Sequence, residues 1–246
     1  MSLVEEKYND WHRNYADSIS REDEIKLMLW HKNVLSVLKK EELKGLRVLE
    51  IGCGIGDFSI YLAKNFDVQV TGTDFSPMAI EIAQKKQSIH AGRVDFRVAD
   101  AQDLPFEDAS FDLIISCECI EHVPNPQKMI DEMHRVLKDK GRFVLTTENY
   151  SNAFAYYFLY LKLAKKSYDS GSGEQPIENF FVYWRILAKF RRAGFKQVRC
   201  FGNEFTFLLI PGTAPDKFAL KDTRSPLLRR LLKPLGRRMT YYGVKE

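Results

Sequence analysis

Residues 48–57 are Val48-Leu49-Glu50-Ile51-Gly52-Cys53-Gly54-Ile55-Gly56-Asp57, and this stretch decides the fold of the chain. An apolar β-rich run leads directly into closely spaced glycines, and a helical pattern follows them. Because glycine lacks a Cβ atom, Gly52, Gly54 and Gly56 can adopt unusual dihedral angles and let a ligand approach the main chain. We expect free N–H groups at the start of the helix to favour a carboxylate or a phosphate. The sequence therefore predicts a strand–turn–helix unit that binds a cofactor.

The spacing of the glycines bears on which cofactor this is. A dinucleotide-binding fingerprint has its third glycine three residues after the second, which is position 57 of this chain. Asp57 stands there, and an acidic side chain would repel a pyrophosphate. A nicotinamide oxidoreductase is therefore the weaker interpretation.

Short β-rich runs alternate with helical stretches from about residue 47 to residue 147. This alternation predicts an α/β fold with a doubly wound, mostly parallel sheet and helices on both faces. Further along, residues 180–194 have a helical pattern, and strand candidates at 196–202 and 204–210 suggest an antiparallel hairpin. Residues 8–39 also have a helical pattern. We expect a single domain, residues 1–246, with a helical leader (1–45), a cofactor-binding core (46–149), an inserted cap (150–180), a helix and hairpin of the sheet (181–210) and a basic tail (211–246).

Two acidic residues lie at the ends of predicted strands, where ligands of open α/β sheets bind. Asp74 ends the run VQVTGTD, and its carboxylate could accept hydrogen bonds from both hydroxyls of a ribose. Asp100 follows VDFRVA and could accept from the amino group of adenine. Each acid alone could equally be a surface or capping residue. The two acids in register with the glycine turn favour a nucleoside.

These motifs together resemble those of the class I S-adenosylmethionine-dependent methyltransferases, over residues 47–147 with weaker support to residue 210. The resemblance implies a Rossmann-like sheet of seven strands with an antiparallel last strand. It implies that S-adenosylmethionine is the cofactor and S-adenosylhomocysteine the product. The stretch from Glu50 to Gly56 would surround the methionine moiety, and Asp74 would hold the ribose. The implied cofactor-binding residues are Glu50, Gly52, Cys53, Gly54, Gly56, Asp74, Phe75, Met78, Asp100, Ala101, Gln102 and Cys117.

Residues 116–126 resemble the corresponding stretch of the small-molecule and quinone-biosynthesis branch of this family. Relatives that methylate DNA amino groups carry an Asn/Asp-Pro-Pro-aromatic motif there, so no DNA partner is expected. If the stretch is helical, Glu118, Glu121 and His122 lie on one face and are the candidate catalytic residues. His122 could be a general base for a hydroxyl acceptor. In the competing interpretation, Glu121 and His122 only cap and orient the loop, and no metal site is predicted.

Charge and composition indicate which kinds of binding partner and which cellular compartment to expect. The net charge is +4, but residues 217–246 hold nine Lys/Arg and two Asp/Glu, or +7, which leaves −3 for the remainder. A slightly acidic body is a poor match to a broad nucleic-acid surface. Four cysteines are too few for a disulfide framework. No apolar run is long enough to span a membrane, and no signal sequence is evident. We expect a cytoplasmic protein with reduced thiols.

The acceptor is expected to be a small, hydrophobic or lipid-like molecule. The aromatics of residues 150–181, together with Tyr8, Trp11 and Tyr15, are candidate acceptor walls, although they could equally be core. Residues 225–238 alternate leucine pairs with basic pairs, which suits either peripheral membrane contact or a helix packed on the domain. The sequence leaves open the oligomeric state, a protein or RNA acceptor, and a non-catalytic nucleoside-binding scaffold.

Overall fold

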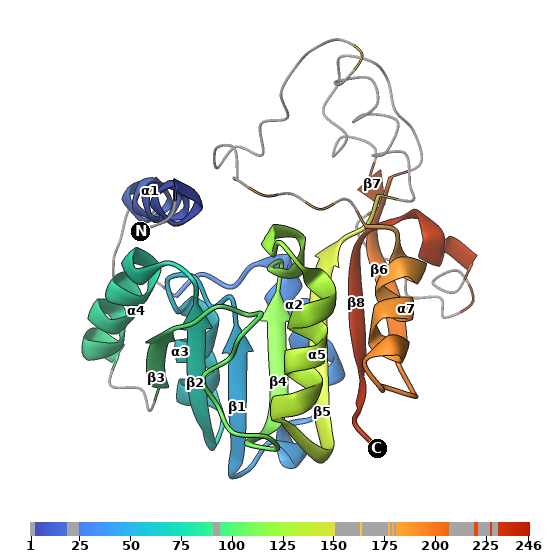
Figure 1. Cartoon of the computed structure of the whole chain (residues 1–246), viewed down its shortest axis with the longest axis horizontal. Helices are drawn as coiled ribbons and strands as arrows, with labels where there is room; N and C mark the ends of the chain where they lie inside the picture. The colour runs from blue at the N-terminus through green and yellow to red at the C-terminus, as the bar shows by residue number, and fades with distance from the viewer. Residues whose placement is uncertain are drawn as a thin grey trace.

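The computed structural model describes residues 3–18, 25–90, 94–150, 163, 177, 179, 181–206, 219–220, 227 and 231–246. Within them, eight strands form one sheet in the order β3-β2-β1-β4-β5-β8-β6-β7 (Figure 1). The strands are β1 (Leu46–Ile51), β2 (Val68–Asp74), β3 (Val94–Val98), β4 (Phe111–Cys117), β5 (Leu137–Glu148), β6 (Arg199–Thr206), β7 (Ala219–Leu220) and β8 (Gly236–Val244). The helices are α1 (Leu3–Ser18), α2 (Leu29–Val37), α3 (Asp57–Asn65), α4 (Pro77–His90), α5 (Pro126–Val136) and α7 (Tyr183–Arg192), with 3-10 turns η1 (Lys40–Glu42), η2 (Ile120–His122) and η4 (Lys233–Leu235).

Pairing within the sheet confirms the predicted Rossmann-like fold. Strands β1 to β5 pair in parallel, whereas β8 is antiparallel to both β5 and β6. The two-residue strand β7 is added at the edge beside β6. The expected seven strands are therefore β1 to β6 and β8.

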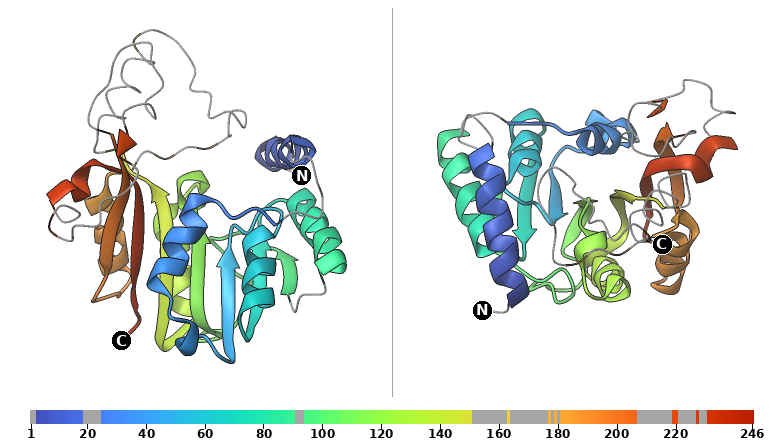
Figure 2. Two further views of the ribbon diagram at one scale, coloured as in Figure 1. Left: turned by 180° about the vertical axis from the view of Figure 1, so that it is seen from behind. Right: turned by 90° about the horizontal axis from the view of Figure 1, so that it is seen from above.

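Alternating residues of the central strands bury two separate cores. Val48 and Leu113 belong to a cluster with residues of α2, α3 and α4, whereas Leu49 and Ile114 belong to a cluster with α5 and α7. Figure 2 shows α2 on the face of the sheet opposite to α5. Period-two burial on both sides explains why these strands have nearly continuous apolar sequences.

The predicted hairpin at residues 196–210 is wrong. Residues 199–206 form the single strand β6, and its long antiparallel partner is β8, which also pairs with β5. Strand β8 lies within the segment assigned to the basic tail. Met239 and Tyr241 on β8 are buried in the core shared with α5 and α7. Burial of this apolar pair favours insertion of β8 between β5 and β6 over a local hairpin.

The predicted continuous helix over residues 8–39 is also wrong. The chain forms α1 and α2, and residues 25–28 between them are not helical. Met28 is extended at the N-terminus of α2, and its backbone N–H donates to Nδ1 of His31 at 3.2 Å. Because the chain turns there, α1 packs against α4, whereas α2 contacts β4, β5 and β8.

The helix expected at residues 180–194 is confirmed as α7, and Gly194 follows it with φ of +103°. Most of the expected cap (150–180) and of residues 211–235 lies outside the described residues, as does the side chain of Tyr15. In the described part of residues 225–238, Leu227 and Leu231 are exposed. Of the helices described, none has the length and apolar character needed to cross a membrane.

We predict that Tyr241→Ala lowers the free energy of unfolding by about 3–5 kcal/mol, the usual cost of removing a buried aromatic ring. Its ring is inaccessible to solvent, and its hydroxyl donates to the Tyr183 carbonyl at 3.2 Å. Urea unfolding measures the change. Val244→Ala, at the exposed end of the same strand, is the control and should cost less than about 1 kcal/mol. Equal losses in both variants would contradict a core position for β8.

Candidate functional site

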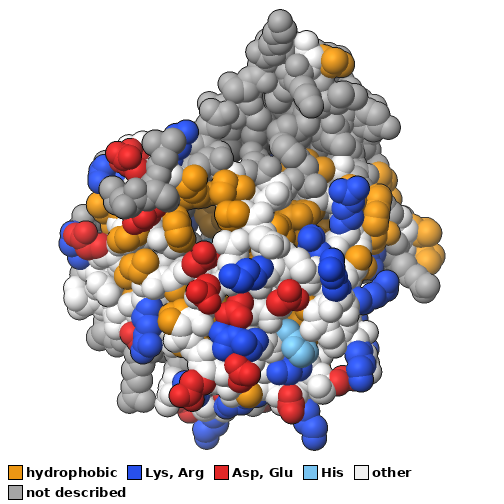
Figure 3. All heavy atoms as spheres, viewed as in Figure 1, with side chains coloured by type: hydrophobic (Ala, Val, Ile, Leu, Met, Phe, Trp, Pro, Cys, Tyr) orange, Lys and Arg blue, Asp and Glu red, His pale blue; other side chains and the backbone are white. Residues whose placement is uncertain are grey.

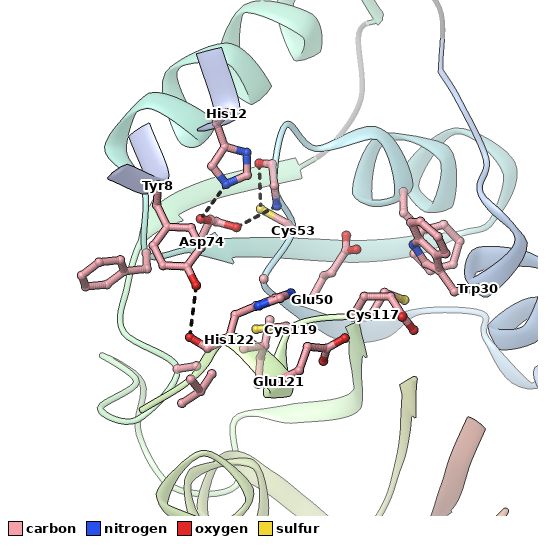
Figure 4. Close-up of a pocket in the computed structure, with 18 of the residues that line it drawn as sticks. Tyr8, His12, Trp30, Glu50, Cys53, Asp74, Cys117, Cys119, Glu121 and His122 are labelled. Atoms are coloured by element: carbon pink, nitrogen blue, oxygen red, sulfur yellow. Dashed lines mark hydrogen bonds and ion pairs between the residues drawn. The ribbon is translucent and has the colours of Figure 1, made fainter. Parts of the chain in front are cut away.

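A cavity of about 740 Å³ lies at the carboxyl ends of the central parallel strands (Figure 4). It is the position at which ligands bind in open α/β sheets. Ten of the twelve expected cofactor residues line it, and Gly56 and Met78 do not. All three expected catalytic residues, Glu118, Glu121 and His122, line the same cavity. Figure 3 shows hydrophobic side chains gathered near this edge, where exposed Phe75 follows β2 and exposed Val98 ends β3.

The glycine turn is shaped by its neighbours. Gly52 has φ of +74°, and a Cβ atom on it would lie 2.6 Å from the side chain of Cys119. The N–H groups of Gly52 and Cys53 both donate to the carbonyl of Thr73, and that of Gly56 donates to the Cys53 carbonyl. The expectation of free N–H groups is therefore wrong at these three residues. The first two bonds tie the turn to the end of β2, and the third closes the turn on itself.

Asp74 is held rigidly at the end of β2. Its carboxylate accepts from the N–H groups of Gly54 and Ser76, each at 2.9 Å. The His12 ring of α1 lies 3.7 Å from the same carboxylate (Figure 4). An ionised carboxylate has about four lone-pair sites, so these two hydrogen bonds leave capacity for both hydroxyls of a ribose. This donor and acceptor pattern fits the expected nucleoside.

Asp100 is held in place by Gln102, two residues further along the chain. Its Oδ1 accepts from the backbone N–H of Gln102 at 2.8 Å and from the Gln102 side chain at 3.0 Å. The Gln102 amide oxygen in turn accepts from the N–H of Asn125, which caps α5. This chain of hydrogen bonds links the expected adenine side of the cavity to the loop that carries the catalytic candidates.

Two other acidic residues at the turn have buried partners. Asp57 forms an ion pair with Lys86 of α4 at 2.7 Å, and both side chains are nearly inaccessible. The repulsion of a pyrophosphate expected from Asp57 is therefore weakened, because Lys86 neutralises the carboxylate. Glu50 accepts from the hydroxyl of Ser59, and burial raises the pKa of its carboxyl group to about 8.

The candidate catalytic residues do not share a helix face. Glu118 follows β4 with φ of +49°, a left-handed conformation that begins no helix, and only the three residues of η2 are helical. Glu121 accepts from Thr147 at 2.9 Å, whereas Nδ1 of His122 bonds the carbonyl of Ile177 at 2.8 Å. The predicted face is wrong because the backbone turns at Glu118. The cavity nevertheless brings the three side chains to one wall.

The hydrogen bond to Ile177 assigns the tautomer of His122. A carbonyl oxygen only accepts, so Nδ1 carries a proton, and whenever the ring is neutral the lone pair is on Nε2. That nitrogen can accept a proton. The η2 turn is held from two sides, because Tyr8 donates to the His122 carbonyl at 3.4 Å and Asn179 donates to the Glu121 carbonyl at 2.7 Å.

Arg238 is a site residue that the sequence interpretation missed. Its guanidinium is 9% exposed and lies 3.1 Å from Glu118, 3.5 Å from Glu148 and 3.3 Å from Glu204. It also lies over the ring of Trp30 of α2, 4.5 Å from the centroid. Pairing of Arg238 with Glu148 places the start of β8 beside the end of β5. The alternation of Met239, Thr240, Tyr241 and Tyr242 after Gly236 was the available signal for a strand.

The carboxyl groups at this wall have perturbed acidities. Burial raises the pKa of Glu118 to about 8, although Arg238 lowers it. Burial also raises the pKa of Glu121 to about 7, although hydrogen bonds within the η2 turn and from Thr147 lower it. Groups that titrate near neutral pH can exchange protons with a substrate.

One group of potential metal ligands occurs among the described residues. His31, Glu50 and Cys117 have ligand atoms within 4.8 Å of one another, and all three are buried. Burial raises the pKa values of Glu50 and Cys117 and lowers that of His31 to about 3. Burial therefore disfavours the charged form of each of the three side chains.

Residues 49–145 match the family model described as "Methyltransferase domain". The match covers 97 of the 246 residues, from β1 to β5, and shows a methyltransferase domain in this part of the chain. The cofactor of this domain is S-adenosylmethionine. Its glycine turn, Asp74 and Asp100 lie inside the matched residues, whereas His12 and Arg238 lie outside them.

Two curated relatives resemble this chain over the domain. Ajmaline N-methyltransferase of Rauvolfia serpentina is 41% identical over 42% of this chain and 36% of its own length. Tocopherol O-methyltransferase of Arabidopsis thaliana is 36% identical over 57% of this chain and 41% of its own. The chain thus spans less than half the length of these two relatives.

A solved structure extends the likeness to the whole chain. An S-adenosylmethionine-dependent methyltransferase of Thermotoga maritima, described as a possible histamine N-methyltransferase, superposes with a TM-score of 0.67 at 19% identity. The match covers 98% of this chain and 99% of the other. At this identity the likeness shows the fold.

We predict that Glu50→Gln becomes more stable relative to the parent protein as the pH rises from 5 to 9. The folded carboxyl has a pKa of about 8, against 4.5 for the unaltered group, so the folded protein binds more protons between these values. Its free energy of unfolding therefore falls with pH in that window and levels off above it. The amide lacks this titration. Urea unfolding at pH 5, 7 and 9 measures the difference.

Glu81→Gln is the matched control, because the Lys85 hydrogen bond lowers the pKa of this exposed carboxyl. It should show no relative gain above pH 5. A constant stability difference between Glu50→Gln and the parent across the range would refute the raised pKa.

Proposed function

We propose that the protein transfers the methyl group of S-adenosylmethionine to a small organic acceptor. The observation that carries this proposal is the continuity of one cavity, lined both by Asp74 and Asp100 and by Glu118, Glu121 and His122. A volume of about 740 Å³ is in the range typical of small-molecule sites. Acceptor and cofactor would thus share one enclosure at the edge of the sheet.

The residues at the glycine turn fit the cofactor. Asp74 would hold the ribose, Asp100 with Ala101 and Gln102 would face the adenine, and Glu50, Gly52 and Cys117 would lie beside the methionine part. S-adenosylmethionine supplies an electrophilic methyl group on a sulfonium. The protein then has to position the acceptor, exclude water and accept a proton where the acceptor carries one.

His122 is the proposed proton acceptor. Its Nε2 bears the lone pair because Nδ1 is bound to the Ile177 carbonyl. Glu121 and Glu118 lie on the same wall and would hold a polar group of the acceptor. The ion pair with Arg238 fixes the orientation of the Glu118 carboxyl.

The lining suggests an acceptor with an apolar body and a polar reacting group. Tyr8, Trp11, Trp30 and Tyr150 provide aromatic surface, whereas Glu148 and both arginines of the 237–238 pair place charged side chains beside Glu118. An acceptor with a polar group can hydrogen-bond these charged side chains, which a purely hydrocarbon acceptor cannot do. The names of the ajmaline and tocopherol relatives also support a small organic acceptor.

Asp74→Ala should weaken binding of S-adenosylhomocysteine about a hundredfold, because two hydrogen bonds to a carboxylate are lost. Isothermal titration calorimetry measures the dissociation constant. Asp95→Ala is the matched control, since this acid on β3 is half exposed, pairs with Arg97 and does not line the cavity. No saturable binding by the folded parent protein would overturn the proposed function.

Methyl transfer is tested with methyl-labelled S-adenosylmethionine and separate pools of small aromatic alcohols and amines, cellular RNA and soluble protein. We expect label in the small-molecule pool, and label confined to RNA or protein would reject that acceptor class. With a hydroxyl acceptor so identified, His122→Ala should slow single turnover by about 10²–10⁴, as expected for a lost general base. His134→Ala, at the contact with Phe195 outside the cavity, should leave the rate unchanged.

A further inference from the structure

Helix α1 lies across the carboxyl edge of the sheet and contacts both halves of the cavity (Figures 1 and 4). Asn9 accepts from the Ser76 hydroxyl at 2.5 Å and from the Met78 N–H at 3.3 Å, which attaches the helix beside the ribose side. Tyr8 donates to the carbonyl of His122, which attaches it beside the acceptor side. Helix α1 therefore covers the site at two anchored points.

Between these anchors, His12 faces the glycine turn. Its Nε2 lies 3.7 Å from Oδ1 of Asp74, and its ring carbon lies 3.6 Å from the position that a Cβ atom on Gly54 would take. A separation of 3.7 Å is too long for a good hydrogen bond. The imidazole ring of His12 thus lies beside the Asp74 carboxylate without a good hydrogen bond to it.

His12 is buried but unsatisfied. The residue is 7% exposed, and its Nδ1 has no hydrogen-bond partner. Burial lowers the pKa of His12 although Asp74 opposes the shift, so the ring is neutral near pH 7 and offers one donor and one acceptor. The nitrogen nearest the Asp74 carboxylate is Nε2, which at 3.7 Å has no good hydrogen bond to that carboxylate and can donate to a ligand hydroxyl beside both side chains.

We infer that His12 completes the ribose site from above, hydrogen-bonding a hydroxyl that Asp74 also binds, and that α1 is the closing element of the cofactor pocket. This inference rests on the proposed function. Its chemistry requires a hydroxyl group, because one hydroxyl can donate to the carboxylate and accept from the imidazole. It also explains why α1, outside the matched domain, is attached to both sides of the cavity.

The inference predicts that His12→Ala affects ligands with and without the contacted hydroxyl to different extents. His12→Ala should raise the dissociation constant of S-adenosylhomocysteine about tenfold, the size of one lost hydrogen bond. It should weaken binding of the 2′-deoxy or the 3′-deoxy analogue much less, because the analogue that lacks the contacted hydroxyl has already lost the bond. A purely structural role would weaken all three ligands equally.

Calorimetry with the three ligands on the full chain tests this expectation. Arg13→Ala is the matched control, since this residue on the same helix is half exposed and pairs with Asp10. His12→Gln, which keeps a hydrogen-bonding group, should recover part of the affinity and serves if the alanine variant does not fold. Equal weakening for all ligands, no change, or tighter binding in both variants would overturn the inference. Binding by the parent protein keeps these outcomes separate from failure of the proposed function.

Discussion

The pairing of β1 with β4 at the centre of the sheet is the constraint on which the site depends. From β1 the chain winds outward in one direction to β2 and β3, and in the other direction to β4 and β5. The connections that follow β1 and β4 therefore run to opposite faces of the sheet. A crevice opens between the carboxyl ends of these two strands. The glycine turn follows β1, and Glu118, Glu121 and His122 follow β4, so the expected cofactor residues and the candidate catalytic residues meet at this crevice.

The antiparallel strand β8 brings a buried charge to the wall of the cavity that carries Glu118. Because β8 runs against β5, its first residues lie beside the last residues of β5, and Arg238 is brought among Glu118, Glu148 and Glu204. Taking such groups out of water is expensive, and removing one partner would leave uncompensated charge. A fold under selection for stability alone gains little from this arrangement. The position of Arg238 and its carboxylate partners in the cavity favours a role in holding a polar acceptor.

Part of the site was predictable because it is local in the sequence. The glycine turn, Asp74 and Asp100 each follow a strand whose apolar pattern marks its end, and parallel strands bring such ends to one edge. The catalytic wall was predicted less well. Residue types at 118–122 indicated chemistry, but the left-handed backbone at Glu118 has no reliable signature in a non-glycine residue.

The sequence by itself determined the Rossmann-like core, the cofactor class and the carboxylates that face it, since these follow from strand periodicity and the spacing of a few residues. Only the tertiary structure decided that the chain end supplies β8, that Arg238 is buried beside Glu118, and that His12 stands over Asp74. The contacts of Arg238 with Glu118 and of His12 with Asp74 join residues 120 and 62 positions apart. They depend on strand insertion and helix docking, which the whole core stabilises and which leave little trace in any short stretch of sequence.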